Sequence, residues 1–210
     1  MGVSDRPIRV LCVDDHRLMR EGIERIVGVQ DDMEVVADAS NGEQAVAQYI
    51  AHRPDVTLMD LQLPVMNGIE AIRRIRQHDP QARIVVLTMY QGDEDIHRAF
   101  EAGAMGYLLK DSIPDELIRV IRDVHAGKRV VIPEIQRVLE QRASGPTLTM
   151  RECQVLELLA RGMRNKEIAA SLGITPDTAG AHMKSIYTKL NVHDRTAALR
   201  EAIRRGIIHI

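Results

Sequence analysis

Two kinds of hydrophobic pattern alternate along the first 126 residues of the chain. Short apolar runs, each as long as a buried strand, occur at residues 8–13, 35–39, 55–59, 83–87 and 105–109. Longer stretches with apolar residues at helical spacing lie between and after them, at residues 17–27, 42–51, 68–77, 93–102 and 114–125. Hairpin turn signals are absent between the runs. The pattern therefore predicts five strand-helix units in succession.

Five such units are typical of an α/β fold in which a five-stranded parallel sheet is doubly wound, with helices on both faces. We expect the strand order of flavodoxin-like folds and, in that order, the first, third and fifth strands side by side. Gly127 and Lys128 end the last helix. Residues 129–146 follow as a predicted linker with a short helical stretch at residues 134–142.

The C-terminal residues have only helical patterns. Thr149 can cap the first of these helices, with Glu152 completing a capping box, and Gly173 ends the second. Two short helices joined by a glycine-bearing turn predict a helix-turn-helix, and hence a small all-α domain. The expected helices lie at residues 150–161, 165–172 and 176–190.

The two predicted domains carry opposite net charge. Residues 147–210 contain ten Lys and Arg against six Asp and Glu, whereas residues 1–146 contain eighteen against twenty-four. A basic module beside an acidic one is expected when only the basic module meets a polyanion such as DNA. We therefore place the domains at residues 7–128 and 147–210, with residues 129–146 as the linker.

Targeting and redox signals are weak in this chain. No apolar stretch has the length of a membrane span, and the first residues lack the apolar segment of a signal peptide. We expect a cytoplasmic protein without a membrane partner. Cys12 and Cys153 fall in a predicted strand and a predicted helix of different domains, so we expect buried small hydrophobic residues rather than a disulfide or a metal pair.

Polar side chains that could take part in catalysis or ligand binding follow the predicted strands at the point where each strand ends. Asp14 and Asp15 follow the first apolar run, and Asp60 follows the third. The carboxyl ends of parallel strands form the edge at which open α/β sheets bind ligands, and oxygen ligands in an acidic pocket suit Mg²⁺. Thr88 and Lys110 end two further runs and offer a hydroxyl and a positive charge to a phosphoryl group. Together these residues predict phosphoryl chemistry on a carboxylate.

With these residues, the segment 7–128 resembles the receiver domain of bacterial two-component response regulators. The resemblance implies that a sensor histidine kinase phosphorylates Asp60, that Lys110 contacts the phosphoryl group, and that Thr88 and Tyr107 carry a conformational shift. It also implies a magnesium cofactor. The implied ligands of Mg²⁺ are Asp14, Asp15, Asp60 and the backbone carbonyl of Gln62.

Two other classes of protein share part of this pattern. An aspartyl-phosphate phosphotransfer enzyme or phosphatase uses a second acid two residues after its nucleophile, but Gln62 occupies that position and cannot donate a proton in that way. A small-molecule-sensing LuxR-type regulator needs a ligand pocket, which usually has aromatic walls, whereas this chain has no Trp and one Phe. We therefore expect a protein that is not an enzyme.

Residues 147–208 resemble the LuxR-type output domain of the NarL/FixJ regulators. The resemblance rests on the segments 148–152, 165–169 and 194–198, together with Thr178, His182, Ile186, Lys189 and Leu190. It implies a transcriptional regulator that binds double-stranded DNA. Phosphorylation would promote its dimerisation and promoter binding, and RNA polymerase is a candidate further partner.

The periodicity of residues 176–190 separates a packing face from an open face. Ala179, Met183, Ile186 and Leu190 share the apolar stripe. Leu199 and Ile203, at helical spacing in a last helix at residues 194–205, are the expected dimer contact, with burial inside one monomer as the competing explanation. The expected DNA contacts are Arg164, Asn165, Lys166, Thr178, Gly180, Ala181, Lys184, Ser185 and Lys189.

Overall fold

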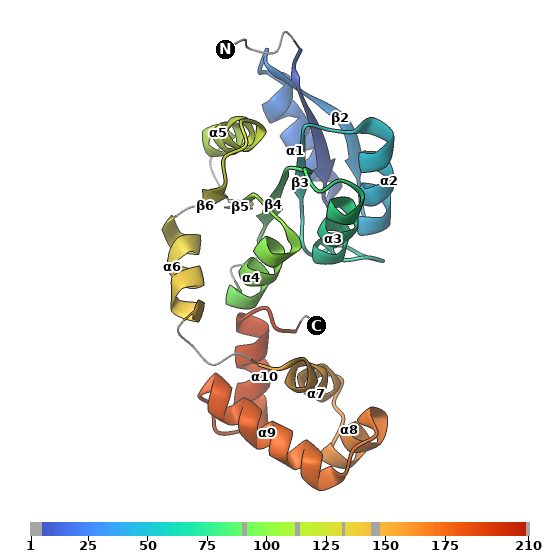
Figure 1. The fold of residues 1–210 in the computed structure, drawn as a ribbon, viewed down its shortest axis with the longest axis vertical. Coiled ribbons are helices and arrows are strands. Elements are labelled where there is room, and N and C mark those ends of the chain that lie inside the picture. Colours follow the sequence, from blue (N-terminus) through green and yellow to red (C-terminus); the bar gives the residue numbers. More distant parts are fainter. Residues whose placement is uncertain (1–5, 90–91, 112–113, 132, 144–147, 209–210) are drawn as a thin grey trace. The chain divides into compact units, whose positions relative to one another are not determined.

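The computed structural model describes residues 6–89, 92–111, 114–131, 133–143 and 148–208. The first part of the chain forms a sheet with helices, and the C-terminal part is helical (Figure 1). The chain divides into two compact units, whose main boundary in the sequence lies between Gln136 and Arg137. The elements are β1 (Ile8–Val13), α1 (Arg17–Gly28), β2 (Met33–Ala39), α2 (Gly42–His52), β3 (Val56–Met59), α3 (Gly68–His78), β4 (Ile84–Thr88), α4 (Asp93–Ala102), β5 (Gly106–Leu109), α5 (Pro114–His125), β6 (Val130–Val131), α6 (Pro133–Ala143), α7 (Met150–Ala160), α8 (Asn165–Leu172), α9 (Pro176–Leu190) and α10 (Arg195–Arg204).

The sheet of the first unit is parallel throughout, with the strand order β2-β1-β3-β4-β5-β6. Helices α1 and α5 cover one face, and α2, α3 and α4 lie on the other (Figure 1). The doubly wound α/β fold expected from the sequence is confirmed. Because β1 and β3 are neighbours, the segments that follow them meet at the same edge of the sheet.

Two expectations about this sheet are wrong. The sheet has six strands rather than five, because β6 adds to the edge of β5 with Val131 opposite Tyr107. An apolar run of only three residues, Val130 to Ile132, is too short to predict a strand, so this strand fell within the predicted linker. The first, third and fifth strands are also not side by side, because β4 lies between β3 and β5.

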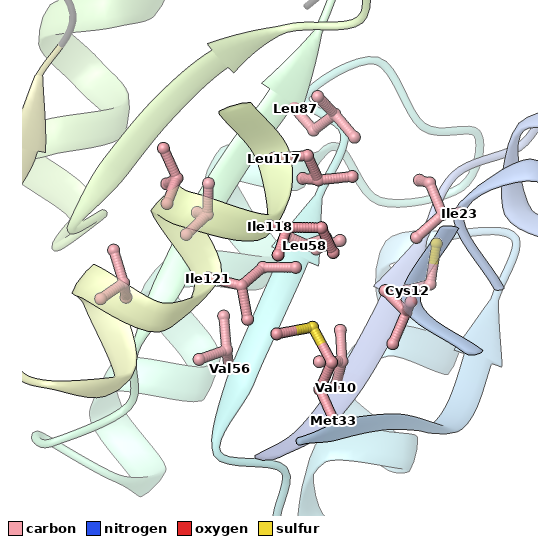
Figure 2. Packing of buried hydrophobic residues seen from close by; sticks show 14 of the residues in the cluster. Val10, Cys12, Ile23, Met33, Val56, Leu58, Leu87, Leu117, Ile118 and Ile121 are labelled. Carbon is pink, nitrogen blue, oxygen red and sulfur yellow. The ribbon is translucent and has the colours of Figure 1, made fainter. Parts of the chain in front are cut away.

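A hydrophobic core of the first unit lies between the sheet and the pair α1 and α5. Figure 2 shows Cys12 of β1 near Ile23 of α1, and Leu58 of β3 near Ile118 and Ile121 of α5. Every residue of β3 is buried, as expected for a parallel strand with both faces covered. Cys12 belongs to this core, as predicted. Burial, helped by the nearby Asp14 carboxylate, raises the pKa of its thiol to about 12 and keeps the thiol protonated.

In the second unit, side chains at the helix termini fix where the helices begin and end. Thr149 and Glu152 form the predicted capping box at the start of α7. Gly173 ends α8 in the left-handed conformation, with φ of 64°, and the Thr175 side chain then accepts the N–H of Thr178 at the start of α9. Helices α8 and α9 have the predicted bounds and form the expected helix-turn-helix.

Candidate functional site

The predicted acids lie at the carboxyl edge of the sheet, where β1 and β3 end side by side. The backbone N–H of Asp60 donates to the carbonyl of Val13, 2.9 Å away, and the N–H of Asp14 donates to Ala39 of β2 at 3.0 Å. Asp14 and Asp60 are buried, whereas Asp15 is exposed. Hydrogen bonds between strand ends therefore fix two of the acids, and the third faces solvent.

Lys110 joins the two buried acids. Its Nζ lies 2.6 Å from Oδ2 of Asp14 and 2.6 Å from Oδ2 of Asp60, and the three side chains are at most 4% exposed. Burial disfavours the ammonium, but the hydrogen bonds to the two carboxylates outweigh it and raise the pKa of Lys110. A lysine that follows β5 thus reaches past β4 to the acids that follow β1 and β3.

His16 links the two adjacent acids. Its backbone N–H donates to Oδ1 of Asp14 at 2.9 Å, and its Nδ1 lies 2.7 Å from Oδ1 of Asp15. Candidate ligand atoms of Asp14, Asp15 and His16 lie within 4.8 Å of one another. Among the described residues, Asp60 does not belong to this group of candidate metal ligands. The structure therefore brings the acidic pair together, and connects Asp60 to it through Lys110.

The loop after β3 is shaped around Asp60. Oδ1 of Asp60 accepts the N–H of Gln62, 3.3 Å away, which closes a turn over the predicted ligand residue. The N–H of Gly68 returns to the carbonyl of Leu61 at 2.9 Å. A Cβ at residue 68 would collide with the carbonyl oxygen of Asp60, so only glycine fits this close approach.

The two predicted switch residues, Thr88 and Tyr107, are fully buried on the neighbouring strands β4 and β5. The carbonyl of Thr88 accepts the N–H of Lys110 at 3.0 Å, which ties the two strand ends together. The ring of Tyr107 lies 6.3 Å from that of Phe100 in α4, and the guanidinium of Arg129 lies 4.4 Å above the Phe100 ring. Tyr107 therefore occupies an inward position with an aromatic neighbour.

Sequence reasoning missed Arg20 of α1. Its guanidinium donates to the backbone carbonyl of Asp14 and to Oδ2 of Asp38, each at 2.6 Å. The sequence signal for it is weak, because an arginine on a surface helix is ordinary and its partners, Asp14 after β1 and Asp38 in β2, are distant from each other in sequence. Arg20 holds the backbone immediately before Asp15.

In the second unit, the apolar stripe of α9 is buried as predicted, with Ala179, Met183, Ile186 and Leu190 at most 5% exposed. Gly180 is half-buried. The other predicted DNA contacts, at the start of α8 and on the first turns of α9, are all exposed. They are Arg164, Asn165, Lys166, Thr178, Ala181 and Lys184.

Two predicted DNA contacts have partners inside the domain instead. The Ser185 hydroxyl donates to Oε1 of Glu152 at 2.7 Å, and Nζ of Lys189 lies 2.8 Å from Oε2 of the same carboxylate. Both side chains are half-buried. These contacts therefore engage the polar groups of both side chains within the domain.

The predicted dimer residues differ in their environment. Leu199 is half-buried and packs against the core of the second unit, whereas Ile203 is 40% exposed. Packing inside the monomer thus covers part of the Leu199 side chain, and Ile203 is the more accessible of the two residues.

Comparison with known proteins decides the family. Residues 10–122 match the response regulator receiver domain, and residues 146–202 match the luxR family of bacterial regulatory proteins. The chain belongs to the LuxR-type two-component response regulators. The regulator is 39% identical to a nitrate/nitrite response regulator protein homolog of Haemophilus influenzae, over 91% of this chain and 94% of that protein.

Solved structures agree with this assignment. The response regulator ChrA of a heme-sensing two-component system is 37% identical, with a TM-score of 0.57, over 96% of this chain and 99% of that one. The RcsB response regulator in its complex with DNA is 26% identical, with a TM-score of 0.69, over 95% and 99% of the two chains.

The response regulator is therefore a DNA-binding transcriptional regulator of a two-component system. Receiver domains bind Mg²⁺ at an acidic site, and the group around Asp14 and Asp15 is acidic. No helix in the described part of the chain is both long enough and apolar enough to cross a membrane.

Proposed function

We propose that Asp60 is the phosphoryl acceptor of this response regulator and that a sensor histidine kinase is the donor. The buried contact of Lys110 with Asp60 and Asp14 carries the proposal. Phosphoryl transfer has a loose transition state, so placement and charge neutralisation supply most of the catalysis. Lys110 provides a fixed positive charge beside the weakly nucleophilic carboxylate.

In the transfer, a carboxylate oxygen of Asp60 forms a bond to phosphorus as the bond from phosphorus to the kinase histidine nitrogen breaks. The histidine leaves with the bonding electron pair. The Lys110 ammonium, which contacts Asp60 before the reaction, then pairs with a phosphoryl oxygen, and Asp14 keeps it at the site. The kinase and the DNA target together favour the cytoplasm as the site of action.

The donor set fits Mg²⁺. The oxygens of Asp14, Asp15, Asp60 and the Gln62 carbonyl are hard ligands, and the exposed Asp15 leaves room for bound water. When bound, Mg²⁺ would neutralise the carboxylates and orient the phosphoryl oxygens.

The response is carried from this site by Thr88 and Tyr107. The Thr88 hydroxyl would turn toward a phosphoryl oxygen, and the Tyr107 ring would fill the space it leaves. The state so favoured would dimerise and bind promoter DNA. The DNA face comprises Arg164, Asn165, Lys166, Thr178, Gly180, Ala181 and Lys184, with Ile203 and Leu199 at the dimer contact.

The test is phosphorylation by acetyl phosphate with Mg²⁺, followed by intact-mass measurement. The wild type should gain one phosphoryl group, and Asp60→Asn should gain none. Asp31→Asn, which changes an exposed aspartate, is the matched control and should be labelled like the wild type. A labelled Asp60→Asn protein would show that the acceptor is another residue.

A further inference from the structure

Glu152 of α7 is a buried carboxylate with four hydrogen-bond donors. Its side chain is 4% exposed. Oε2 accepts the backbone N–H of Thr149 at 2.6 Å and its hydroxyl at 3.0 Å, as well as Nζ of Lys189 at 2.8 Å. Oε1 accepts the Ser185 hydroxyl at 2.7 Å. One carboxylate therefore caps α7 and also binds α9 at two points.

The capping of α7 does not explain the bonds to α9. A capping box needs only the reciprocal bonds between Thr149 and Glu152. Ser185 and Lys189 are four residues apart and lie on the same face of α9, so Glu152 contacts that helix across a full turn. The additional bonds fix the C-terminal half of α9 against the start of α7.

The contact with Glu152 also neutralises the positive charge of Lys189 within the domain. The Lys189 side chain is 25% exposed and its ammonium is paired with the buried Glu152 carboxylate. Lys184, five residues earlier on the same helix, is exposed. The two lysines of α9 thus differ: one is available to DNA and the other is neutralised within the domain.

We propose that Glu152 is a positioning residue for DNA recognition, which holds α9 in register through Ser185 and withholds the charge of Lys189 from DNA phosphates. Each phosphate contact adds affinity for every DNA sequence alike. Withholding one lowers the affinity for all sequences alike, so the gain in specificity comes from the fixed α9, which holds the base contacts of its first turns in place. Glu152 would thereby raise the ratio of specific to nonspecific affinity.

The test measures binding of the full-length regulator to its preferred site and to random DNA over a series of salt concentrations. Glu152→Gln should steepen the salt dependence on random DNA, with the slope of log K against log[salt] growing by about 0.9, because Lys189 is released to a phosphate. The ratio of specific to nonspecific affinity should fall at least about fivefold. Lys189→Met should leave the slope unchanged, because its charge is already engaged.

Matched variants separate this role from folding and from net charge. Glu157→Gln removes the same charge from an exposed position of α7 and should behave as the wild type. Ser185→Ala keeps the charge pair, so it should lower specificity without changing the slope. If Glu152→Gln lacks the circular dichroism of a folded protein, Ser185→Ala and Lys189→Met still decide the question.

Two results would overturn the proposal: a slope that is the same in folded Glu152→Gln and wild type, or a slope reduced by about one in Lys189→Met, which would place Lys189 on a phosphate. The inference rests on the proposed DNA face of α8 and α9. Lysine variants on that face separate a failure of the DNA face from a failure of the role of Glu152. Normal DNA binding by both Lys184→Ala and Lys166→Ala would contradict the DNA face itself, whereas weakened binding with an unchanged Glu152→Gln slope would contradict only the role of Glu152.

Discussion

Nζ of Lys110 lies 2.6 Å from Oδ2 of Asp60, and both side chains are 4% exposed. The proposed phosphoryl acceptor is therefore one half of a buried ion pair before it reacts. Addition of a phosphoryl group must rearrange this pair, because the charge that Lys110 faces changes in size and position. The resting contact is thus a natural starting point for a conformational response.

The first prediction follows from the shared lysine. Lys110→Met leaves Asp14 and Asp60 buried without their common cation, so the free energy of unfolding should fall by about 3 kcal/mol in buffer without Mg²⁺. Added Mg²⁺ should restore much of this loss, because it supplies the missing positive charge. Urea denaturation with and without Mg²⁺ measures both effects. Lys128→Met, at an exposed lysine, is the control, and an equal loss with and without Mg²⁺ would contradict a metal site at these acids.

Asp15 provides the second prediction. Its carboxylate is exposed, so Asp15→Ala should change the free energy of unfolding by less than about 0.5 kcal/mol. The variant should nevertheless bind Mg²⁺ more weakly and accept phosphate more slowly, because one oxygen ligand is lost. The chain has no Trp, so amide chemical shifts rather than indole fluorescence should follow the Mg²⁺ titration. A titration like that of the wild type and of Asp31→Ala would show that Asp15 is not a ligand.

The third prediction concerns Lys184 on the exposed face of α9. If it reads a base, Lys184→Ala should cost about 1 to 3 kcal/mol on the preferred site and relax the preference at one position. If it contacts a phosphate, binding to all sequences should weaken alike and the salt slope should fall by about one. Footprinting and salt titrations separate the two, with Lys128→Ala as the control. Unchanged binding on every sequence would remove Lys184 from the DNA face.

The dimer contact gives the fourth prediction. Ile203 is 40% exposed, so Ile203→Glu should leave the monomer folded and abolish cooperative binding to two half-sites. Leu199→Glu should in addition lower the melting temperature, because Leu199 packs on the core of its own domain. Cooperative footprints from a folded Ile203→Glu protein would exclude Ile203 from the interface.

The fifth prediction is a pH dependence. Burial would raise the pKa of Glu152, but its bonds to Lys189, Ser185 and Thr149 outweigh burial and lower it from 4.5 to about 2. Stability from the ionised carboxylate is therefore fully present above pH 4.5 and is lost as the pH falls toward 2. The contribution is on the order of 3 kcal/mol. Denaturation of wild type and Glu152→Gln from pH 7 to pH 3 should show a difference that shrinks with falling pH, and a constant difference would contradict the assignment.

The sequence predicts the elements of the sheet well because each strand and helix has its own local pattern. It also predicts Asp14, Asp15, Asp60 and Lys110 as a set, since all follow strands that end at one edge. It does not predict β6, because Val130 and Val131 become a strand only through pairing with β5. Pairing is a property of the tertiary structure rather than of two apolar residues.

Side-chain partners that are distant in sequence were the least predictable feature of the C-terminal unit. Helical periodicity places Ser185 and Lys189 away from the apolar stripe, which made them candidates for DNA contact. Their bonds to Glu152 connect residues 33 and 37 positions apart. No pattern along α9 alone contains that information, although the capping box correctly located Glu152 at the start of α7.

The short strand β6 covers the outer edge of β5. Val131 lies opposite Tyr107, and the N–H of Val130 donates to the carbonyl of Met105 at 2.8 Å. A receiver domain shortened to residue 128 would lose this cover, together with Arg129 above Phe100, and would present an open strand edge to solvent. Such an edge is a template for strand addition by a second molecule. Self-association of a receiver trimmed at that point would therefore report the exposed edge rather than the state of Asp60.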